Sequence, residues 1–488
     1  MKQQKLTCVV CNKELPEEGF YYSKTVCDKC YKKRVRYKHS RDYVDSLLPL
    51  VVETDGIFVF TAVMPNTGIH SEALDALESL CSSLGATMFC IGIKAHQKPL
   101  KDEELYYPRR LERVLQRDIT IGDTRVADFR VAPQRMNPLA SLDRVEYNKN
   151  IGIASPKQHS NVYPVGNEKL RRVFSTGTIS LPAYRRTEVT GVIGEEAHKI
   201  GAVLVRVVGG VAIEIKPLEF ICGGFTYNTI KYSRGAALPN AVDTIVFGDL
   251  HAESMTYTLN RLLLSIIELY NPRAIVLHDV VSGASVSHHN TNKPLTKPNI
   301  SMLEDIERTR RLFGIIIEVC PDIQIILPDC NHDKHTEDYV ASGCWVKDDL
   351  NRDTCIAMIP YLKRPRPLMS YILSETNDSY AVDPYVLLRG RDSHYIHGID
   401  VSNHGHAHAS GKKGSIDLFD RTHGRCITAH SHQIQWRNNA WSVGRFTAKR
   451  LGYNNYADVS EEGYIIIYAD GCREIFNNSL LTGLDTFM

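Results

Sequence analysis

The second half of the chain contains five short apolar runs, and each one ends in acidic, amide or imidazole side chains. The runs are DTIVFGD, RAIVLHD, IQIILPD, YIHGIDVS and RCITAHS, which begin at Asp243, Arg273, Ile323, Tyr395 and Arg425. Short runs rich in Ile and Val are typical of buried strands. Apolar residues recur at helical spacing in two of the intervening segments, Thr256–Tyr270 and Met302–Ile317. Strands that alternate with helices predict a layered α/β fold.

The first half of the chain shows the same alternation over a shorter stretch. GIFVFTAVM, from Gly56, and ATMFCIGI, from Ala86, have the composition of buried strands. The segment between them, Ser71–Gly85, has helical apolar spacing and ends in a glycine that can terminate a helix. We therefore expect a βαβ unit here, and we interpret the loop PNTGIHSE before the helix as a turn. From Ile151 to Phe225 the pattern predicts strands, with a tight hairpin at Gly209–Gly210.

Two pairs of cysteines lie within the N-terminal forty residues. Cys8 and Cys11 form one CxxC motif, and Cys27 and Cys30 form another. Four thiolates at this spacing suit one tetrahedral, structural Zn²⁺, which would supply the folding energy of a segment with little core of its own. We therefore predict a zinc ribbon over residues 1–41, an α/β accessory region with a β-rich second half over 42–240, and a catalytic domain over 241–488.

A basic run, YKKRVRYKHSR, follows the second cysteine pair from Tyr31 to Arg41. Its mixture of cations and aromatic rings suits nucleic-acid phosphates and bases. The candidate contacts are Lys32, Lys33, Arg34, Arg36 and Lys38. A solvated helix accounts for the run about equally well, and a zinc ribbon can also mediate protein–protein contact.

Composition narrows the class of protein without naming a partner. The chain has 488 residues, 43% of them hydrophobic and 23% charged, as in an ordinary globular protein of two or three domains. Its net charge of +2 excludes a global basic field, so any contact with nucleic acid must rest on local patches. There is an odd number of cysteines, 13, several of them in apolar runs, and no apolar stretch is long enough to cross a bilayer. We expect a cytoplasmic protein with no membrane partner.

The polar residues after the five apolar runs should lie close together, because the carboxyl ends of neighbouring parallel strands meet at one edge of a sheet. Carboxylate, amide and imidazole groups together bind divalent cations, and a pair of such cations indicates phosphate-ester chemistry. Because the chain has nineteen histidines, any single histidine motif can arise by chance. An ordered series of ligands, each at a strand end, favours one shared site.

In their order, the motifs D-x-H, Asp, N-H-D, His and H-x-H resemble those of the calcineurin-like metallophosphoesterases. The nearest likeness is to the nuclease branch, the SbcD-type exonucleases and the early DNases of tailed phages. The resemblance covers about Asp243–Ile475 and implies a two-sheet α/β sandwich that holds two divalent metals, Mn²⁺ being the best suited. The resemblance implies that Asp249, His251 and His432 bind the first ion and that Asn331, His404 and His430 bind the second. It also implies that Asp279 bridges the two ions and that His332 is the catalytic imidazole.

Three positions depart from the pattern of that superfamily, which has glycine before the bridging Asp, before the Asn–His pair and before the last pair of histidines. This chain has His278, Cys330 and Ala429 at those positions. Glycine relieves backbone strain in tight loops, so the exchanges bear on loop geometry more than on the ligand types.

Several neighbouring residues are further candidates for the site. In the fourth motif His404, His406 and His408 can each be the ligand, and we favour His404 because it comes first after the strand. Residues that would reach substrate or support the ligands from behind are Glu253, His288, His289, Asp333 and His335. A polar surface loop explains the pair of histidines at 288–289 equally well.

These features predict a two-metal phosphodiesterase, and they favour a Mn²⁺-dependent DNase that hydrolyses the phosphodiester bonds of DNA. A phosphomonoesterase or small-nucleotide phosphodiesterase is the first alternative. The second is a protein without enzymatic activity that keeps metals for structure and binds a partner. Relatives by resemblance often form homo-oligomers, and a phage-encoded chain would act in the host cytoplasm.

Overall fold

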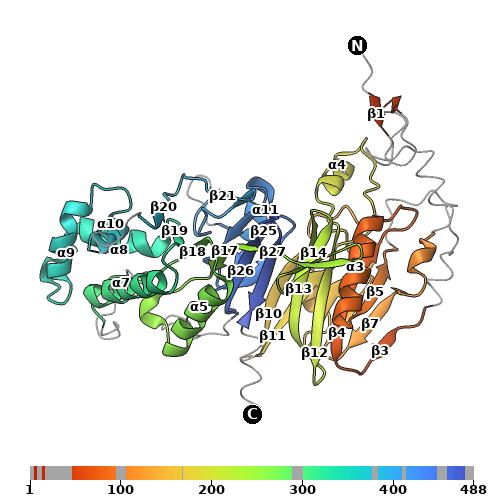
Figure 1. Cartoon of the computed structure of the whole chain (residues 1–488), viewed down its shortest axis with the longest axis horizontal. Coiled ribbons are helices and arrows are strands. Elements are labelled where there is room, and N and C mark those ends of the chain that lie inside the picture. Colours follow the sequence, from red (N-terminus) through yellow and green to blue (C-terminus); the bar gives the residue numbers. More distant parts are fainter. Residues whose placement is uncertain are drawn as a thin grey trace. The chain divides into compact units, whose positions relative to one another are not determined.

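A computed structural model describes residues 5–7, 14–16, 47–94, 106–166, 169–287, 300–375, 383–408, 414–447 and 459–478. The chain divides into two compact units. The first unit is Met1–Asn240 with Trp436–Asn438, and the second is Ala241–Gln435 with Asn439–Met488. Both units contain helices and mixed sheets, so the α/β class expected from the sequence is confirmed (Figure 1).

The first unit contains the βαβ arrangement expected from its apolar spacing. Strands β4 (Gly56–Val63) and β5 (Thr87–Gly92) pair in parallel and are joined by helix α3 (Ser71–Leu84). The His70 side chain caps the first turn of α3, and Gly85 ends the helix in the left-handed conformation at φ 64°. The apolar face of α3 is buried against the sheet.

The other strands of the first unit complete two large sheets. The eight-stranded sheet has the order β16-β15-β14-β13-β12-β4-β5-β6 and adds β6 (Leu115–Gln116), β12 (Gly201–Val208), β13 (Val211–Ile221), β14 (Gly224–Tyr227), β15 (Ile230–Ser233) and β16 (Ala236–Pro239). The six-stranded sheet has the order β10-β11-β9-β8-β7-β3 and consists of β3 (Leu50–Val52), β7 (Asp118–Ile121), β8 (Thr124–Ala127), β9 (Asn150–Ile153), β10 (Ser160–Val165) and β11 (Lys169–Ser175). The remaining pieces are β1 (Lys5–Thr7), β2 (Glu14–Pro16), η2 (Arg109–Leu111), η3 (Leu142–Arg144) and α4 (Val189–Glu196).

The hairpin predicted at Gly209–Gly210 is confirmed. It joins β12 to β13, and both glycines have positive φ, 58° and 73°. The Asp55 carboxylate accepts hydrogen bonds from both of their backbone N–H groups, at 2.8 and 3.2 Å. Two consecutive residues with positive φ match the right-handed twist of the strands, and glycine adopts this conformation without steric cost.

The second unit is built on a six-stranded sheet with the order β20-β19-β18-β17-β26-β27. Its strands are β17 (Val242–Phe247), β18 (Ala274–Leu277), β19 (Gln324–Leu327), β20 (Tyr385–Leu387), β26 (Gly463–Tyr468) and β27 (Arg473–Asn477). The first four are parallel, and β26 and β27 are antiparallel to their neighbours. Strands β17, β18 and β19 are nearly continuous runs of buried Ile, Val, Leu and Phe, as expected for parallel strands covered on both faces.

Helices connect these parallel strands. They are α5 (Tyr257–Tyr270), α7 (Met302–Val319), α8 (Asn331–Ser342), α9 (Arg352–Met358) and α10 (Pro367–Leu373), with the short turns η4 (Ala252–Ser254), η6 (Cys344–Lys347) and η7 (Ile359–Tyr361). Both α5 and α7 begin at a hydroxyl side chain, Thr256 or Ser301, that accepts a hydrogen bond from a backbone N–H of the first turn. The two helices predicted in this region are therefore confirmed.

A second, five-stranded sheet of this unit has the order β21-β22-β23-β25-β24. It consists of β21 (Tyr395–Ile396), β22 (Ile399–Asp400), β23 (Cys426–Thr428), β24 (Ile434–Trp436) and β25 (Ala440–Val443), preceded at β23 by α11 (Ile416–Thr422). The expectation that YIHGIDVS forms one strand is wrong. His397 and Gly398 both have positive φ, 47° and 75°, and they fold the run into a hairpin of β21 and β22.

Two sequence predictions lie outside the described residues, namely the four cysteines of the zinc ribbon and the basic run that follows them. Across the part of the chain that the structure describes, no helix has the length and apolar character needed to cross a membrane.

Candidate metal centre

The first strand of the parallel sheet delivers Asp249 and His251 to the centre of the second unit. Gly248 precedes them at a close crossing of the chain, where a Cβ atom would stand 2.6 Å from the Arg445 Cα atom. Glycine is therefore required at this turn. Both Asp249 and His251 are buried, and the Asp249 Oδ1 atom accepts a hydrogen bond of 3.2 Å from the backbone N–H of His430.

The loop after β18 runs beside the loop after β17. The backbone N–H of His251 donates to the Asp279 carbonyl at 2.9 Å, and the N–H of Leu250 donates to the His278 carbonyl at 3.1 Å. This pairing continues the parallel arrangement past the strand ends. It places the Asp279 carboxylate within reach of side chains from both sheets of the second unit.

The loop after β19 leads directly into α8, whose first two residues are Asn331 and His332. The His332 Nδ1 atom lies in hydrogen-bond contact with the Ser282 carbonyl oxygen, which can only accept, so Nδ1 carries the hydrogen. The Nε2 atom of His332 is then left to face the site, 3.8 Å from the Asp279 Oδ2 atom.

The second sheet supplies three histidines. The His404 Nε2 atom lies 3.0 Å from the Asp279 Oδ2 atom and 3.0 Å from the Asn331 Oδ1 atom. The His432 Nε2 atom lies 2.9 Å from the Asp249 Oδ2 atom. The rings of His404 and His430 are 5.2 Å apart.

The structure thus brings all seven predicted metal ligands and His332 together. These residues form three groups in which one ligand atom of each residue lies within 4.8 Å of those of the others. The groups are Asp249–His251–His432, Asp279–His404–His430 and His251–Asp279–His332. Asp279 belongs to two of these groups, which suits a shared ligand. These groupings can hold metal ions.

Unpartnered polar atoms test whether the site fits cations. The buried atoms without a hydrogen-bond partner among the described residues include both ring nitrogens of His251, the Oδ1 atom of Asp279 and the Nδ1 atom of His404. Burying such groups without partners costs about 1–3 kcal/mol each. Divalent cations would satisfy carboxylate oxygens and imidazole nitrogens at once, so the donor set fits them.

The charge states of the site also suit cation binding. Burial, with the charge of His332, lowers the pKa of His251 to about 3, and burial with the charge of His404 lowers the pKa of His430 to about 4. Burial alone would raise the pKa of Asp279, but the charges of His404 and His332 hold it well below its usual range. The neutral His251 and His430 imidazoles and the ionised Asp279 carboxylate are the forms that bind metals. Burial lowers the pKa of His404, but the Asp279 carboxylate raises it well above its usual value, so this imidazole must release a proton when an ion binds.

Four of the predicted ligands have strained backbones. His251, Asp279, His430 and His432 have φ values of 44°, 43°, 63° and 55°, in the left-handed region that side-chain-bearing residues seldom adopt. Such strain gathers at functional sites, where the surrounding structure maintains it.

The three positions where the superfamily has glycine are not among the strained ones. His278 and Ala429 do not have positive φ, and Cys330 has a φ of −118°. The glycine-to-side-chain exchanges therefore cost no left-handed strain in this chain.

The structure separates the three candidate histidines of the fourth motif. His404 is buried at the centre of the site. His406 is half-buried, with its ring 5.5 Å from that of His404. His408 is directed elsewhere, and its Nε2 atom lies 2.9 Å from the Thr422 hydroxyl.

The other candidates lie around the centre. The Glu253 carboxylate accepts a hydrogen bond of 2.9 Å from the Ser254 hydroxyl, and no hydrogen bond between described residues joins it to His251. Asp333 is buried and accepts a hydrogen bond of 2.7 Å from the Arg366 guanidinium. The His335 ring lies 5.8 Å from that of His332. His288 and His289 lie outside the described residues.

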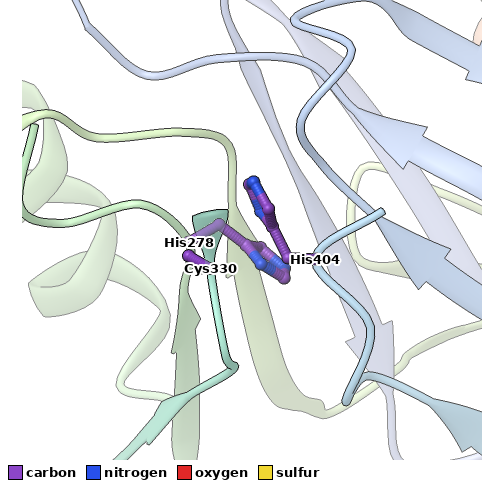
Figure 2. Close-up of side chains that lie close together, drawn as sticks. All are labelled: His278, Cys330 and His404. Carbon is purple, nitrogen blue, oxygen red and sulfur yellow. The ribbon is translucent and has the colours of Figure 1, made fainter. Parts of the chain in front are cut away.

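Sequence reasoning missed two side chains at the site, His278 and Cys330. Together with His404 they form a further group whose ligand atoms lie within 4.8 Å of one another, and Figure 2 shows the three side chains gathered among the strand-end loops. The signal was present, because both residues stand where the superfamily has glycine. It was interpreted only as a matter of loop geometry.

Comparisons with known proteins give one distant likeness. The chain is 23% identical over 468 residues to Protein A1 of Escherichia phage T5. The alignment covers 86% of this chain and 81% of that protein. The aligned part is longer than either unit, so the likeness extends over both. No family model and no solved structure matches the chain.

Proposed function

We propose that the chain is a two-metal phosphodiesterase of metallophosphoesterase type, and that its substrate is DNA. The observation that carries the proposal is the convergence of buried carboxylates and imidazoles from five strand-end loops, with several of their polar atoms unpartnered. A group of ion pairs with a purely structural role would not leave polar atoms unpartnered, because its charged groups hydrogen-bond to one another.

The ligand set supports two cation positions that share Asp279. Asp249, His251 and His432 would hold one ion, and Asn331, His404 and His430 would hold the other. The mixture of carboxylate, amide and imidazole donors suits Mn²⁺. When bound, two such ions act as Lewis acids on a phosphate ester and make water a stronger nucleophile near neutral pH.

His332 is the residue best placed to move a proton. Its Nδ1 hydrogen is committed to the Ser282 carbonyl, which fixes the ring and leaves Nε2 facing the site. Burial lowers the pKa of His332, but the Asp279 carboxylate and the Ser282 carbonyl together raise it above its ordinary value. An imidazole that is partly protonated near pH 7 can donate a proton to the leaving oxygen of a phosphodiester.

DNA is the preferred substrate for two reasons, both from the sequence. The order of motifs resembles the nuclease branch of the superfamily, and the run Tyr31–Arg41 supplies cations and aromatic rings. The likeness to a phage protein agrees with a resemblance that includes phage DNases. We propose further that one structural Zn²⁺ is held by the N-terminal cysteines.

The deciding experiment compares two substrates in the presence of Mn²⁺. Linear and plasmid DNA are incubated with the full chain, and turnover of an aryl phosphate is measured beside them. Cleavage of DNA with little turnover of the aryl phosphate is expected. The reverse preference would favour a phosphomonoesterase, and no turnover of either substrate by a chain that binds Mn²⁺ would favour a partner-binding protein.

A further inference from the structure

His278 is a buried imidazole whose ring nitrogens form no hydrogen bond within the described residues. Its side chain is fully inaccessible to solvent, at 0% exposure, and neither ring nitrogen has a hydrogen-bond partner among the described residues. An imidazole always has a donor or an acceptor on each nitrogen, so this arrangement leaves two polar atoms unsatisfied. The backbone conformation does not require a special residue here, because the φ of His278 is not positive.

Two potential ligands lie beside His278. The Cys330 thiol is buried, donates to the Pro328 carbonyl at 3.3 Å and accepts the backbone N–H of Asp279, also at 3.3 Å. His404 is buried as well, and its Nδ1 atom, 3.8 Å from the Asp249 Oδ1 atom, has no hydrogen-bond partner in the described part of the chain. The three residues come from the ends of β18, β19 and β22, and the structure gathers them within 4.8 Å (Figure 2).

We propose that His278, Cys330 and His404 form a site for a thiophilic divalent cation such as Zn²⁺. A tetrahedral Zn²⁺ ion with bonds of about 2.0–2.3 Å to nitrogen and sulfur needs its ligand atoms less than about 4 Å apart. The observed ligand atoms lie within 4.8 Å of one another, so binding would draw them together by up to about 1 Å. Three protein ligands leave a fourth position for water or a carboxylate oxygen.

The donor set explains the preference for a soft ion. A thiolate and two imidazoles favour Zn²⁺ over Mn²⁺, whereas the neighbouring set of Asp279, His430 and an amide favours harder ions. When the metal–sulfur bond forms, the Cys330 thiol loses its proton to solvent. The backbone N–H of Asp279 already donates to this sulfur and would remain as a hydrogen bond to the thiolate.

His404 belongs to both ligand sets, and this couples them. An ion held by His278 and Cys330 takes an imidazole away from the set of Asp279, Asn331 and His430. Binding of Zn²⁺ at the thiolate set should therefore weaken the binding of Mn²⁺ at the second cation position. A soft ion would compete with a hard one through a single shared histidine.

The test uses Co²⁺, which reports sulfur ligands by a thiolate-to-metal charge-transfer absorption in the near ultraviolet. The full chain is titrated with Co²⁺ beside the variants Cys330→Ser, His278→Gln and Cys355→Ser. Cys355 is a matched control, because it is also a fully buried cysteine of the second unit but lies in α9, outside the group. The N-terminal cysteines are the same in all four proteins, so differences between spectra isolate the proposed site.

We expect Cys330→Ser to remove part of the charge-transfer band that the parent and Cys355→Ser share. His278→Gln should keep the thiol but weaken binding of that Co²⁺ ion by at least about 10- to 100-fold, since loss of a group that only supports a ligand already has an effect of that size. A second measurement, Zn²⁺ retained after dialysis against Mn²⁺, should fall by one ion per chain in Cys330→Ser.

Equal bands in the parent and Cys330→Ser would overturn the proposal, provided that both proteins have the same circular dichroism spectrum. If Cys330→Ser does not fold, the spectrum of His278→Gln decides alone, and a titration identical to that of the parent would overturn the proposal. Neither readout requires hydrolysis of DNA. The metal site and the nuclease activity can therefore fail separately.

Discussion

Two loops in this molecule occupy the same place in similar folds, yet they differ in one physical property. One follows β4 in the first unit and the other follows β17 in the second, and each leads from a parallel strand toward a helix that connects it to the next strand. Both contain polar residues and a histidine. In the first loop the polar side chains are satisfied by hydrogen bonds to backbone groups, whereas in the second the buried histidine ring has no hydrogen-bond partner among the described residues.

The polar side chains of the loop after β4 are satisfied by backbone groups of the first unit. The Thr67 hydroxyl donates to the Met64 carbonyl at 2.8 Å, and the Asn66 side-chain oxygen accepts the backbone N–H of Tyr106 at 2.8 Å. The His70 Nδ1 atom accepts the N–H of Ala73 at 3.2 Å and caps α3. This loop is a turn, as the sequence indicated.

In the loop after β17, the Asp249 Oδ1 atom accepts the backbone N–H of His430 at 3.2 Å, whereas the His251 side chain lacks such a partner in the described part of the chain. Both ring nitrogens of His251 are buried and unpartnered among the described residues. The comparison shows that polar residues at a strand end do not by themselves indicate a binding site. Several unsatisfied buried ligand atoms that gather around one point do, because a bound ion can complete them all at once.

The largest expected effect comes from removing the shared carboxylate. Asp279→Ala should abolish binding of both Mn²⁺ ions and reduce DNA hydrolysis by about 10⁴-fold or more, beyond the usual effect of one acid–base residue. Metal content by mass spectrometry and turnover of linear DNA measure this. Asn66→Ala, in the satisfied loop, is the control and should bind as much Mn²⁺ as the parent. A variant at Asp279 that kept both ions would remove its role as the bridge.

His332→Ala should act on turnover and spare the metals. We expect hydrolysis to fall by about 10²–10⁴-fold, because a positioned proton donor is lost while the metal ligands remain. Initial rates on linear DNA and metal content are measured together. His423→Ala, at the C-terminal end of α11, serves as the histidine control. Equal rates for His332→Ala and the parent would contradict the assigned role.

Mn²⁺ itself should stabilise one loop and not the other. At a hundred times its dissociation constant, a ligand stabilises the folded state by about 2.7 kcal/mol. For a unit of this size that corresponds to a rise in unfolding temperature of about 5–10 °C. Calorimetry and hydrogen exchange should show the change around residues 249–251 and 278–280, with none around 64–70. Chelation should reverse it, and equal protection of both loops would contradict the comparison.

The smallest expected effect lies in the satisfied loop. His70→Ala removes the side chain that caps α3, and loss of a helix cap costs about 0.5–2 kcal/mol. Denaturant unfolding should show a less stable first unit, and Mn²⁺ binding should stay as in the parent. A change in metal content without a change in stability would mean that this loop, too, is a binding site.

The sequence by itself determined the elements that depend on local patterning. The alternation of apolar strands and helices, the hairpin at Gly209–Gly210 and the cap at Gly85 follow from hydrophobic period and glycine chemistry, which act over a few residues. The types and order of the candidate ligands were also legible, since each stands beside its own strand. The sequence alone shows that the predicted strand ends of the second half are rich in Asp and His.

Tertiary structure decided which of these side chains meet. His404 rather than His408 reaches Asp279, YIHGIDVS folds back on itself at His397, and His278 joins Cys330. These outcomes depend on contacts between loops far apart in the chain and on positive φ values at residues other than glycine, which local propensity does not encode. Whether a buried polar atom finds a partner is likewise a property of the packed molecule. For that reason the difference between a turn at His70 and a candidate cation site at His251 appeared only in the fold.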